Sequence, residues 1–141
     1  MNIAAGLFRR TGALVGLILW QISAATAGYS AGKIDEPLAR HLASEAYSGD
    51  SSIEPYLERE PKISLPFITF NGLTVPPAEG SFGYFAVNPW TGDVWALWGC
   101  HRLSTPALRR SQAEIRRRFS RSEMRRYARL RRLKPKCGAE Y

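Results

Sequence analysis

The sequence predicts an α+β domain, in which helices flank a small antiparallel sheet. Three observations lead to this fold class: an apolar repeat of four residues near the start, two β-hairpin patterns in the middle, and a helical, Arg-rich C-terminal part. The expected order is one helix, two hairpins and two helices. We expect a single domain at residues 35–141, with its basic helical part at 105–134, after a flexible start at 28–34.

Residues 1–27 have the layout of a secretory signal peptide. Arg9 and Arg10 precede an apolar run at 13–20, and the segment ends in an A-x-A pattern at Ala27. The apolar run is shorter than the roughly 20 residues that a membrane span requires, which favours cleavage. A periplasmic or secreted protein is therefore expected, and the alternative is an inner-membrane protein that keeps this segment as an anchor.

The first helix is expected at residues 36–47, where apolar side chains recur every four positions. Asp35 can accept hydrogen bonds from the free N–H groups of the first turn, and Pro37 suits that turn. Gly49 is expected to end the helix.

The first hairpin is expected around Asn71-Gly72, between an alternating stretch at 63–70 and a short apolar run at 73–75. Asn-Gly is a strong hairpin signal, because a type I′ turn needs positive φ at both central residues. Pro66 and Pro76 lack the N–H that a sheet ladder uses, which favours an edge position for these strands.

The second hairpin is expected at residues 84–98. Asn88, Pro89 and Gly92 supply the chemistry of a tight turn, and the flanking runs are aromatic or β-branched. Both faces of these runs are apolar, which predicts a central strand pair that helices cover on one side.

The aromatic residues of this hairpin have two expected roles. Trp95 and Phe85 are expected in the core, because small domains use such side chains for packing. Trp90 lies in the turn, where side chains are commonly exposed, and is the candidate for an aromatic contact with a partner.

The stretch V-N-P-W-T-G-D-V-W within residues 84–98 resembles the final hairpin of PepSY-type domains. The resemblance covers fifteen residues. It implies a small exported α/β module, of a kind associated with inhibiting or chaperoning secreted peptidases, and it assigns no functional residue to this chain.

Two helices are expected in the C-terminal part. Thr105 can cap the first, Pro106 suits its first position, and residues 120–123 have the form of a capping box for the second. The second helix is expected to run to about Leu133, before Pro135. One face of the first helix is apolar apart from a serine, through Leu108, Ser111, Ile115 and Phe119.

Cys100 and Cys137 are the two cysteines of the chain. In an exported protein such a pair predicts a disulfide bond. The bridge would tie the end of a strand region to the C-terminal tail.

Charge is distributed unevenly along the chain. Residues 28–100 contain four Lys and Arg against nine Asp and Glu, whereas residues 101–141 contain twelve Arg and two Lys against three Glu. Arginine favours bidentate contacts with carboxylates and phosphates. The arginines expected to bind an anionic partner are Arg109, Arg110, Arg116, Arg117, Arg125, Arg126, Arg129 and Arg132.

The expected partner is an acidic protein or an anionic surface of the cell envelope, with membrane contact as one form of the latter. A basic helix face that only keeps the protein soluble is the alternative interpretation. Nucleic acid fits the charge, but export argues against it.

The sequence contains no catalytic motif that selects a reaction. G-x-S-x-G, H-E-x-x-H and P-loop patterns are absent. His41 and Glu45 would share a helix face, but two ligands do not complete a zinc site. Cys100 and His101 are adjacent strand residues, which point to opposite faces. We therefore expect no cofactor, no metal and no enzymatic activity; the alternative is a small envelope hydrolase that uses His41 or His101.

These observations together predict a small exported binding protein, of an inhibitor or immunity type, that uses a basic helical face.

Overall fold

The structure, a computed structural model, describes residues 33–47, 56–74 and 80–138. Within these residues the chain forms three helices and one five-stranded antiparallel sheet, which confirms the predicted α+β class. The elements in chain order are α1 (Glu36–Tyr47), β1 (Tyr56–Arg59), β2 (Ile68–Leu73), β3 (Ser81–Val87), β4 (Val94–Ala96), β5 (His101–Arg102), α2 (Pro106–Arg117) and α3 (Met124–Leu130). The expected signal peptide at 1–27 and the helix stop at Gly49 lie outside the described residues.

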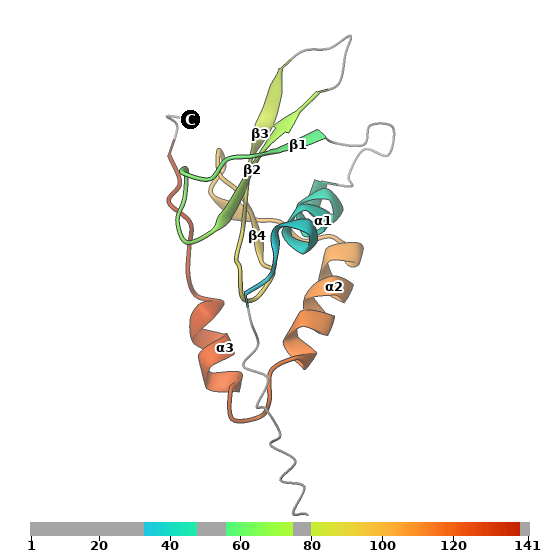
Figure 1. Ribbon diagram of the computed structural model, residues 1–141, viewed down its shortest axis with the longest axis vertical. Helices are drawn as coiled ribbons and strands as arrows, with labels where there is room; N and C mark the ends of the chain where they lie inside the picture. The colour runs from blue at the N-terminus through green and yellow to red at the C-terminus, as the bar shows by residue number, and fades with distance from the viewer. Residues whose placement is uncertain (1–32, 48–55, 75–79, 139–141) are drawn as a thin grey trace, which may run out of the picture.

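The sheet is a meander in which each strand pairs with its neighbours in sequence, in the order β1-β2-β3-β4-β5 (Figure 1). The expected second hairpin is present as β3 and β4, which pair Ala86 with Trp95 and Val87 with Val94. This hairpin supplies the middle of the sheet, as its apolar faces predict.

The hairpin predicted at Asn71-Gly72 is wrong. Both residues lie inside β2, where Asn71 pairs with Glu58 on one side and Tyr84 on the other, so β2 is not an edge strand either. The glycine serves packing, because a Cβ at Gly72 would lie 2.5 Å from the ring of Phe82. The Asn71-Gly72 pair therefore marks a place where an aromatic ring approaches the backbone closely, and not a turn. The first hairpin instead joins β1 to β2 through residues 60–67.

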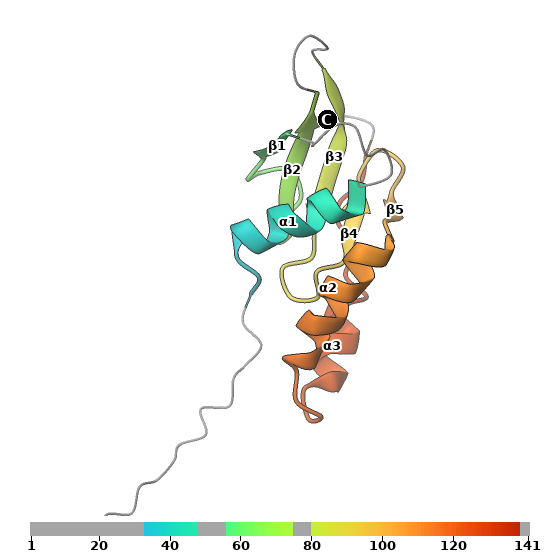
Figure 2. The ribbon, with the colours of Figure 1, turned by 90° about the vertical axis from the view of Figure 1, so that its right-hand side faces the viewer.

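α1 crosses one face of the sheet, and α2 packs beside it (Figure 2). As predicted, α1 spans residues 36–47, and the Asp35 carboxylate accepts a 3.0 Å hydrogen bond from the N–H of Leu38. Ile34 is buried and its N–H donates to the carbonyl of Pro89, so the expected flexible start does not include Ile34. The main core between helices and sheet contains Leu42, Phe70, Phe85, Val87, Val94, Leu108 and Ile115.

A second, smaller core lies on the other side of β3 and β4. It contains Phe67, Ala86, Trp95 and Leu97, with the partly buried Cys137 packed against it. The predicted disulfide joins Cys137 to Cys100, with their Cα atoms 5.6 Å apart. The bridge holds the C-terminal segment over this core, and both Phe85 and Trp95 are buried, as expected.

The cap of α2 is the one that the sequence predicts, whereas α3 begins only at Met124, with Glu123 as its N-cap and without a side-chain cap hydrogen bond. The Thr105 side chain accepts a hydrogen bond from the N–H of Leu108, and Pro106 begins α2. The Glu123 carboxylate accepts from the N–H of Ser120, which completes one half of the expected capping box. α3 ends at Leu130, three residues before the predicted position.

Gly92 is expected to resist substitution. Its φ is +70°, and a Cβ would lie 2.7 Å from Cδ1 of Ile115. Gly92→Ala should lower the free energy of unfolding by about 2 kcal/mol, through left-handed strain and overpacking. Urea denaturation measures this loss, and Gly138→Ala is the control, because a Cβ there meets nothing within 4 Å. Equal stability of the two variants would contradict the role given to Gly92.

Candidate anion-binding site

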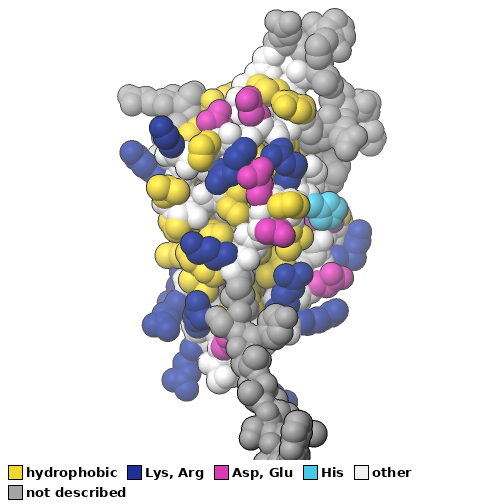
Figure 3. Space-filling view, in the orientation of Figure 1, with side chains coloured by type: hydrophobic (Ala, Val, Ile, Leu, Met, Phe, Trp, Pro, Cys, Tyr) yellow, Lys and Arg dark blue, Asp and Glu magenta, His cyan; other side chains and the backbone are white. Residues whose placement is uncertain are grey.

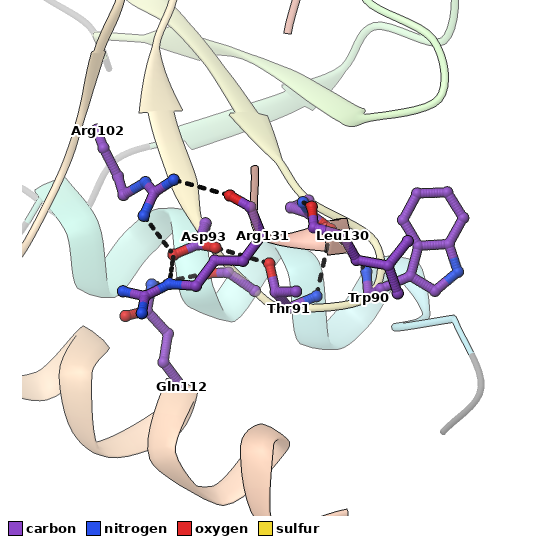
Figure 4. A network of polar contacts seen from close by, with 9 residues as sticks. Trp90, Thr91, Asp93, Arg102, Gln112, Leu130 and Arg131 are labelled. Atoms are coloured by element: carbon purple, nitrogen blue, oxygen red, sulfur yellow. Dashed lines mark hydrogen bonds and ion pairs between the residues drawn. The ribbon is translucent and has the colours of Figure 1, made fainter. Parts of the chain in front are cut away.

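The turn between β3 and β4 is hydrogen-bonded both to α2, through Gln112, and to the end of α3, through Leu130 (Figure 4). The side-chain amide of Asn88 donates to the carbonyl of Leu130 at 2.8 Å, at the end of α3. The amide of Gln112, on α2, donates to the carbonyl of Gly92 at 3.0 Å. The turn itself is closed because Oδ1 of Asn88 accepts from the N–H groups of Trp90 and Thr91.

A buried carboxylate, Asp93, organises the cationic side chains near this turn. Asp93 is only 2 % exposed and accepts a 2.7 Å hydrogen bond from the Thr91 hydroxyl through Oδ2. Its Oδ1 lies 3.5 Å from Nη1 of Arg102 and 3.5 Å from Nε of Arg131. Arg102 also donates to the carbonyl of Arg131 at 3.0 Å (Figure 4). These contacts fix β5 relative to the end of α3.

A pocket of about 720 Å³ opens beside this network, between β5, α2, α3 and the segment that follows α3. We call it the Tyr127 pocket. Its lining combines five cationic side chains with three apolar or aromatic ones. These residues are Arg102, Arg116, Arg131, Arg132, Lys134, Met124, Tyr127 and Ala128. No acidic side chain is among them, so the pocket suits a negatively charged ligand.

Tyr127 is a buried residue of this pocket and packs edge-on against Phe119, with the ring centres 4.9 Å apart. Burial raises the pKa of its hydroxyl above the usual 10.0, and the nearby charge of Asp93 raises the pKa further. The positive charges of three nearby arginines partly offset this rise by lowering the pKa of Tyr127; they are Arg131, Arg116 and Arg102. Tyr127 is therefore a neutral hydroxyl at neutral pH.

The raised pKa predicts a loss of stability in alkali. Because the pKa of Tyr127 is higher in the folded protein than in the unfolded chain, folding favours the protonated form. Its contribution is complete below the unfolded pKa and is lost as the pH rises through the folded one. Urea denaturation between about pH 9 and about pH 11 should show a steeper fall for the wild type than for Tyr127→Phe. Parallel curves for the two proteins would contradict this account.

Five of the eight predicted arginines line three neighbouring pockets. Arg116 and Arg132 line the Tyr127 pocket. Arg125 and Arg129 line a hollow of about 470 Å³, and Arg117 lines another of about 440 Å³. The rest of the predicted set, Arg109, Arg110 and Arg126, does not line these three pockets.

The sequence interpretation missed several residues of the Tyr127 pocket. Arg102 comes from the short strand β5, and Arg131 and Lys134 come from the segment after α3. Arg131 and Lys134 are part of the basic run, so charge alone could have included them. Nothing local marks Arg102 or Tyr127, because only the packing of β5 and α2 against α3 brings them together.

Trp90 does not belong to this site. Its indole points away from the Asp93 network (Figure 4), is partly buried, and has the Lys33 ammonium 5.5 Å from the ring centre. Its expected contact with a partner stays a prediction. Trp98 is the more exposed tryptophan, at 54 %.

The residues considered for catalysis are placed as follows. His41 lies on α1, with Nε2 3.4 Å from Oε1 of Glu45, and its side chain is exposed. His101 lies on β5 and is also exposed, and the sulfur of Cys100 is bonded to Cys137. Within the described part of the chain, no three His, Cys, Asp or Glu residues are grouped to hold a metal ion.

Positive charge gathers at one end of the molecule. Figure 3 shows Lys and Arg side chains interspersed with acidic ones over the sheet, whereas in the lower half of the view, where α2 and α3 lie in Figure 1, Lys and Arg have few acidic side chains among them. In the residues 33–47, 56–74 and 80–138, no helix is both long and apolar enough to span a membrane.

No protein-family model matches the sequence, and no curated protein matches it. The structure is similar to a chain of a type VI secretion system effector–immunity complex from Pseudomonas protegens, with 19 % sequence identity and a TM-score of 0.48. The similarity covers 70 % of this chain and 89 % of the other.

Proposed function

We propose that this chain is a small exported binding protein that recognises an acidic protein through the surface formed by residues 113–117 at the end of α2, by α3 and by residues 131–134. We call this surface the basic end. The observation that carries the proposal is the Tyr127 pocket, in which five cationic side chains gather without an acidic side chain in the lining.

The charge balance of the pocket supports a ligand rather than simple solvation. Asp93 lies close to Arg102 and Arg131, so these two guanidinium groups already have a carboxylate. No Asp or Glu of the described residues lies within ion-pair distance of Arg116, Arg132 or Lys134. Clustered like charges oppose compact folding, and carboxylates of a partner would relieve that repulsion.

The disulfide between Cys100 and Cys137 supports the proposal that the protein works in an oxidising compartment outside the cytosol, because such bonds are rare in the cytosol. Export itself is proposed from residues 1–27, and a mature protein that starts at Gly28 by mass spectrometry is the expected result. The finer proposal is that binding blocks the partner, as an inhibitor or immunity protein does. We propose no catalytic role, since the sulfur of Cys100 is bonded to Cys137 and the side chain of His41 is exposed on α1.

The proposal is tested by capture from an envelope extract, with residues 28–141 as immobilised bait at low and high salt. A specific acidic protein should bind at low salt and be released at high salt, because screening weakens contacts between exposed charges. Calorimetry with that purified protein should then give a Kd that rises at least about tenfold between 0.05 M and 0.5 M salt.

Two variants control the capture. Arg116→Gln with Arg132→Gln removes two cations of the Tyr127 pocket that form no ion pair with the described residues, and it should abolish capture. Arg109→Gln with Arg110→Gln removes the same charge from the first turns of α2, outside this pocket, and should retain most of it. Capture that is insensitive to salt and to both variants would contradict the proposed function.

A further inference from the structure

We infer that the Tyr127 pocket binds a specific kind of segment on the partner, in which an apolar residue is flanked in the partner's sequence by acidic residues on both sides. This inference rests on the proposed function and adds the chemistry of the segment that is recognised. It is carried by the shape of the basic end and by the mixed lining of the pocket.

The shape favours an extended chain rather than a single ion. The Tyr127 pocket shares Arg116 and Met124 with the 440 Å³ hollow, and it shares Ala128 and Arg132 with the 470 Å³ hollow. The two smaller hollows share no lining residue with each other, so the Tyr127 pocket lies between them in a row that extends from the end of α2 over α3. A polypeptide segment can fill such a row, whereas a lone phosphate or carboxylate would occupy only a part of one hollow.

The lining is apolar at depth and cationic around it. Tyr127 is buried and Met124 is half-buried, whereas the guanidinium-bearing residues Arg116 and Arg132 are exposed. An apolar side chain placed on Tyr127 and Met124 would leave water, which is favourable in proportion to the area it buries. Carboxylates on the neighbouring residues would then meet the cationic side chains at the edge. A purely acidic segment would contact only the cationic side chains at the edge of the pocket and would leave the apolar lining in contact with water.

Asp93 determines which cations of the pocket are available to a ligand, because it pairs with two of them. By engaging Arg102 and Arg131 it holds two walls of the pocket in place and partly neutralises them. Arg116, Arg132 and Lys134 then present the charge that a ligand can pair: Arg116 lies where the Tyr127 pocket meets the 440 Å³ hollow, and Arg132 lies where it meets the 470 Å³ hollow. This arrangement matches carboxylates on both sides of a central apolar residue.

The test uses fluorescein-labelled peptides and residues 28–141 of the protein, with binding followed by fluorescence anisotropy at low salt. One peptide carries two glutamates on each side of a leucine, and the second has serine in place of that leucine. The leucine peptide should bind about tenfold tighter, which corresponds to partial burial of one leucine side chain. A third peptide, with the leucine moved to its end, should bind like the serine peptide.

Variants locate the effect. Ala128→Glu places a carboxylate in the pocket at an exposed helix position and should weaken the leucine peptide at least tenfold. Met124→Gln should remove most of the preference for leucine and leave the serine peptide almost unchanged. Arg109→Gln with Arg110→Gln is the control and should preserve the preference, because neither residue lines the pocket.

The outcomes separate the inference from the proposed function. Equal affinity for the leucine and serine peptides, with retained capture of an acidic protein, would overturn the inference and leave the proposed function standing. Binding to vesicles that contain phosphatidylglycerol, with no binding of any peptide and no acidic protein captured, would overturn both and assign the basic end to the membrane surface.

Discussion

Replacing Cys100 and Cys137 together with alanine is expected to lower the free energy of unfolding by about 4 kcal/mol. The bond closes a loop between residues 37 apart in sequence, and without it the unfolded chain gains the corresponding conformational freedom. The folded state also loses the link that holds Cys137 against Phe67, Trp95 and Leu97. This is a large share of the stability of a small domain.

Urea denaturation followed by tryptophan fluorescence measures the effect, since the buried Trp95 reports on the second core. The wild type treated with a reductant should behave like the double variant, and the reductant should leave the double variant unchanged. A difference below about 1 kcal/mol between the oxidised wild type and the double variant would show that the bridge is not a main source of stability.

Asp93→Ala is expected to lower the free energy of unfolding by about 3 kcal/mol. The substitution leaves Arg102 and Arg131 close together without their shared carboxylate, and it removes the acceptor of the Thr91 hydroxyl. The loss stays below that of a fully buried ion pair, because the side chains of Arg102 and Arg131 are 34 % and 51 % exposed.

Glu114→Gln is the matched control for Asp93→Ala. Glu114 is an exposed acidic residue of α2, and its substitution should change stability by less than about 0.5 kcal/mol. Thermal and urea denaturation of both variants at one salt concentration make the comparison. If the two variants are equally stable, Asp93 is not the group that organises the pocket wall.

The sequence predicted the elements whose signals are local. The bounds of α1 followed from Asp35 and a four-residue apolar repeat, and the start of α2 followed from Thr105 and Pro106. The turn after β3 followed from Asn88 and Gly92. In each case the side chain that defines the element contacts a backbone group a few residues away, so no knowledge of the rest of the fold is needed.

The sequence could not distinguish two uses of glycine. Asn71-Gly72 has the composition of a type I′ turn, but the absence of a Cβ at Gly72 makes room for the ring of Phe82. That need arises between neighbouring strands, and a turn signal read along one strand does not contain it. The same reasoning applies to β5, a strand of two residues that exists because it pairs with β4.

The sequence predicted the positive charge of the candidate site but not which residues come together to form the pocket. The arginine run located the basic end, and Arg116 and Arg132 were in the predicted set. The pocket also needs Arg102 and Tyr127, whose positions depend on the packing of β5 and α3 around Asp93. In the sequence Asp93 looks like an ordinary turn residue, because no nearby residue indicates that it contacts Arg131.

The most direct test of the account is an NMR titration of ¹⁵N-labelled residues 28–141 with a short poly-glutamate peptide. The account predicts amide shifts that saturate and that concentrate on residues 113–117, on α3 and on residues 131–134, with the largest ones around Arg116 and Arg132. Absent shifts, or shifts centred on β1 and β2, would contradict the claim that the basic end is the binding surface.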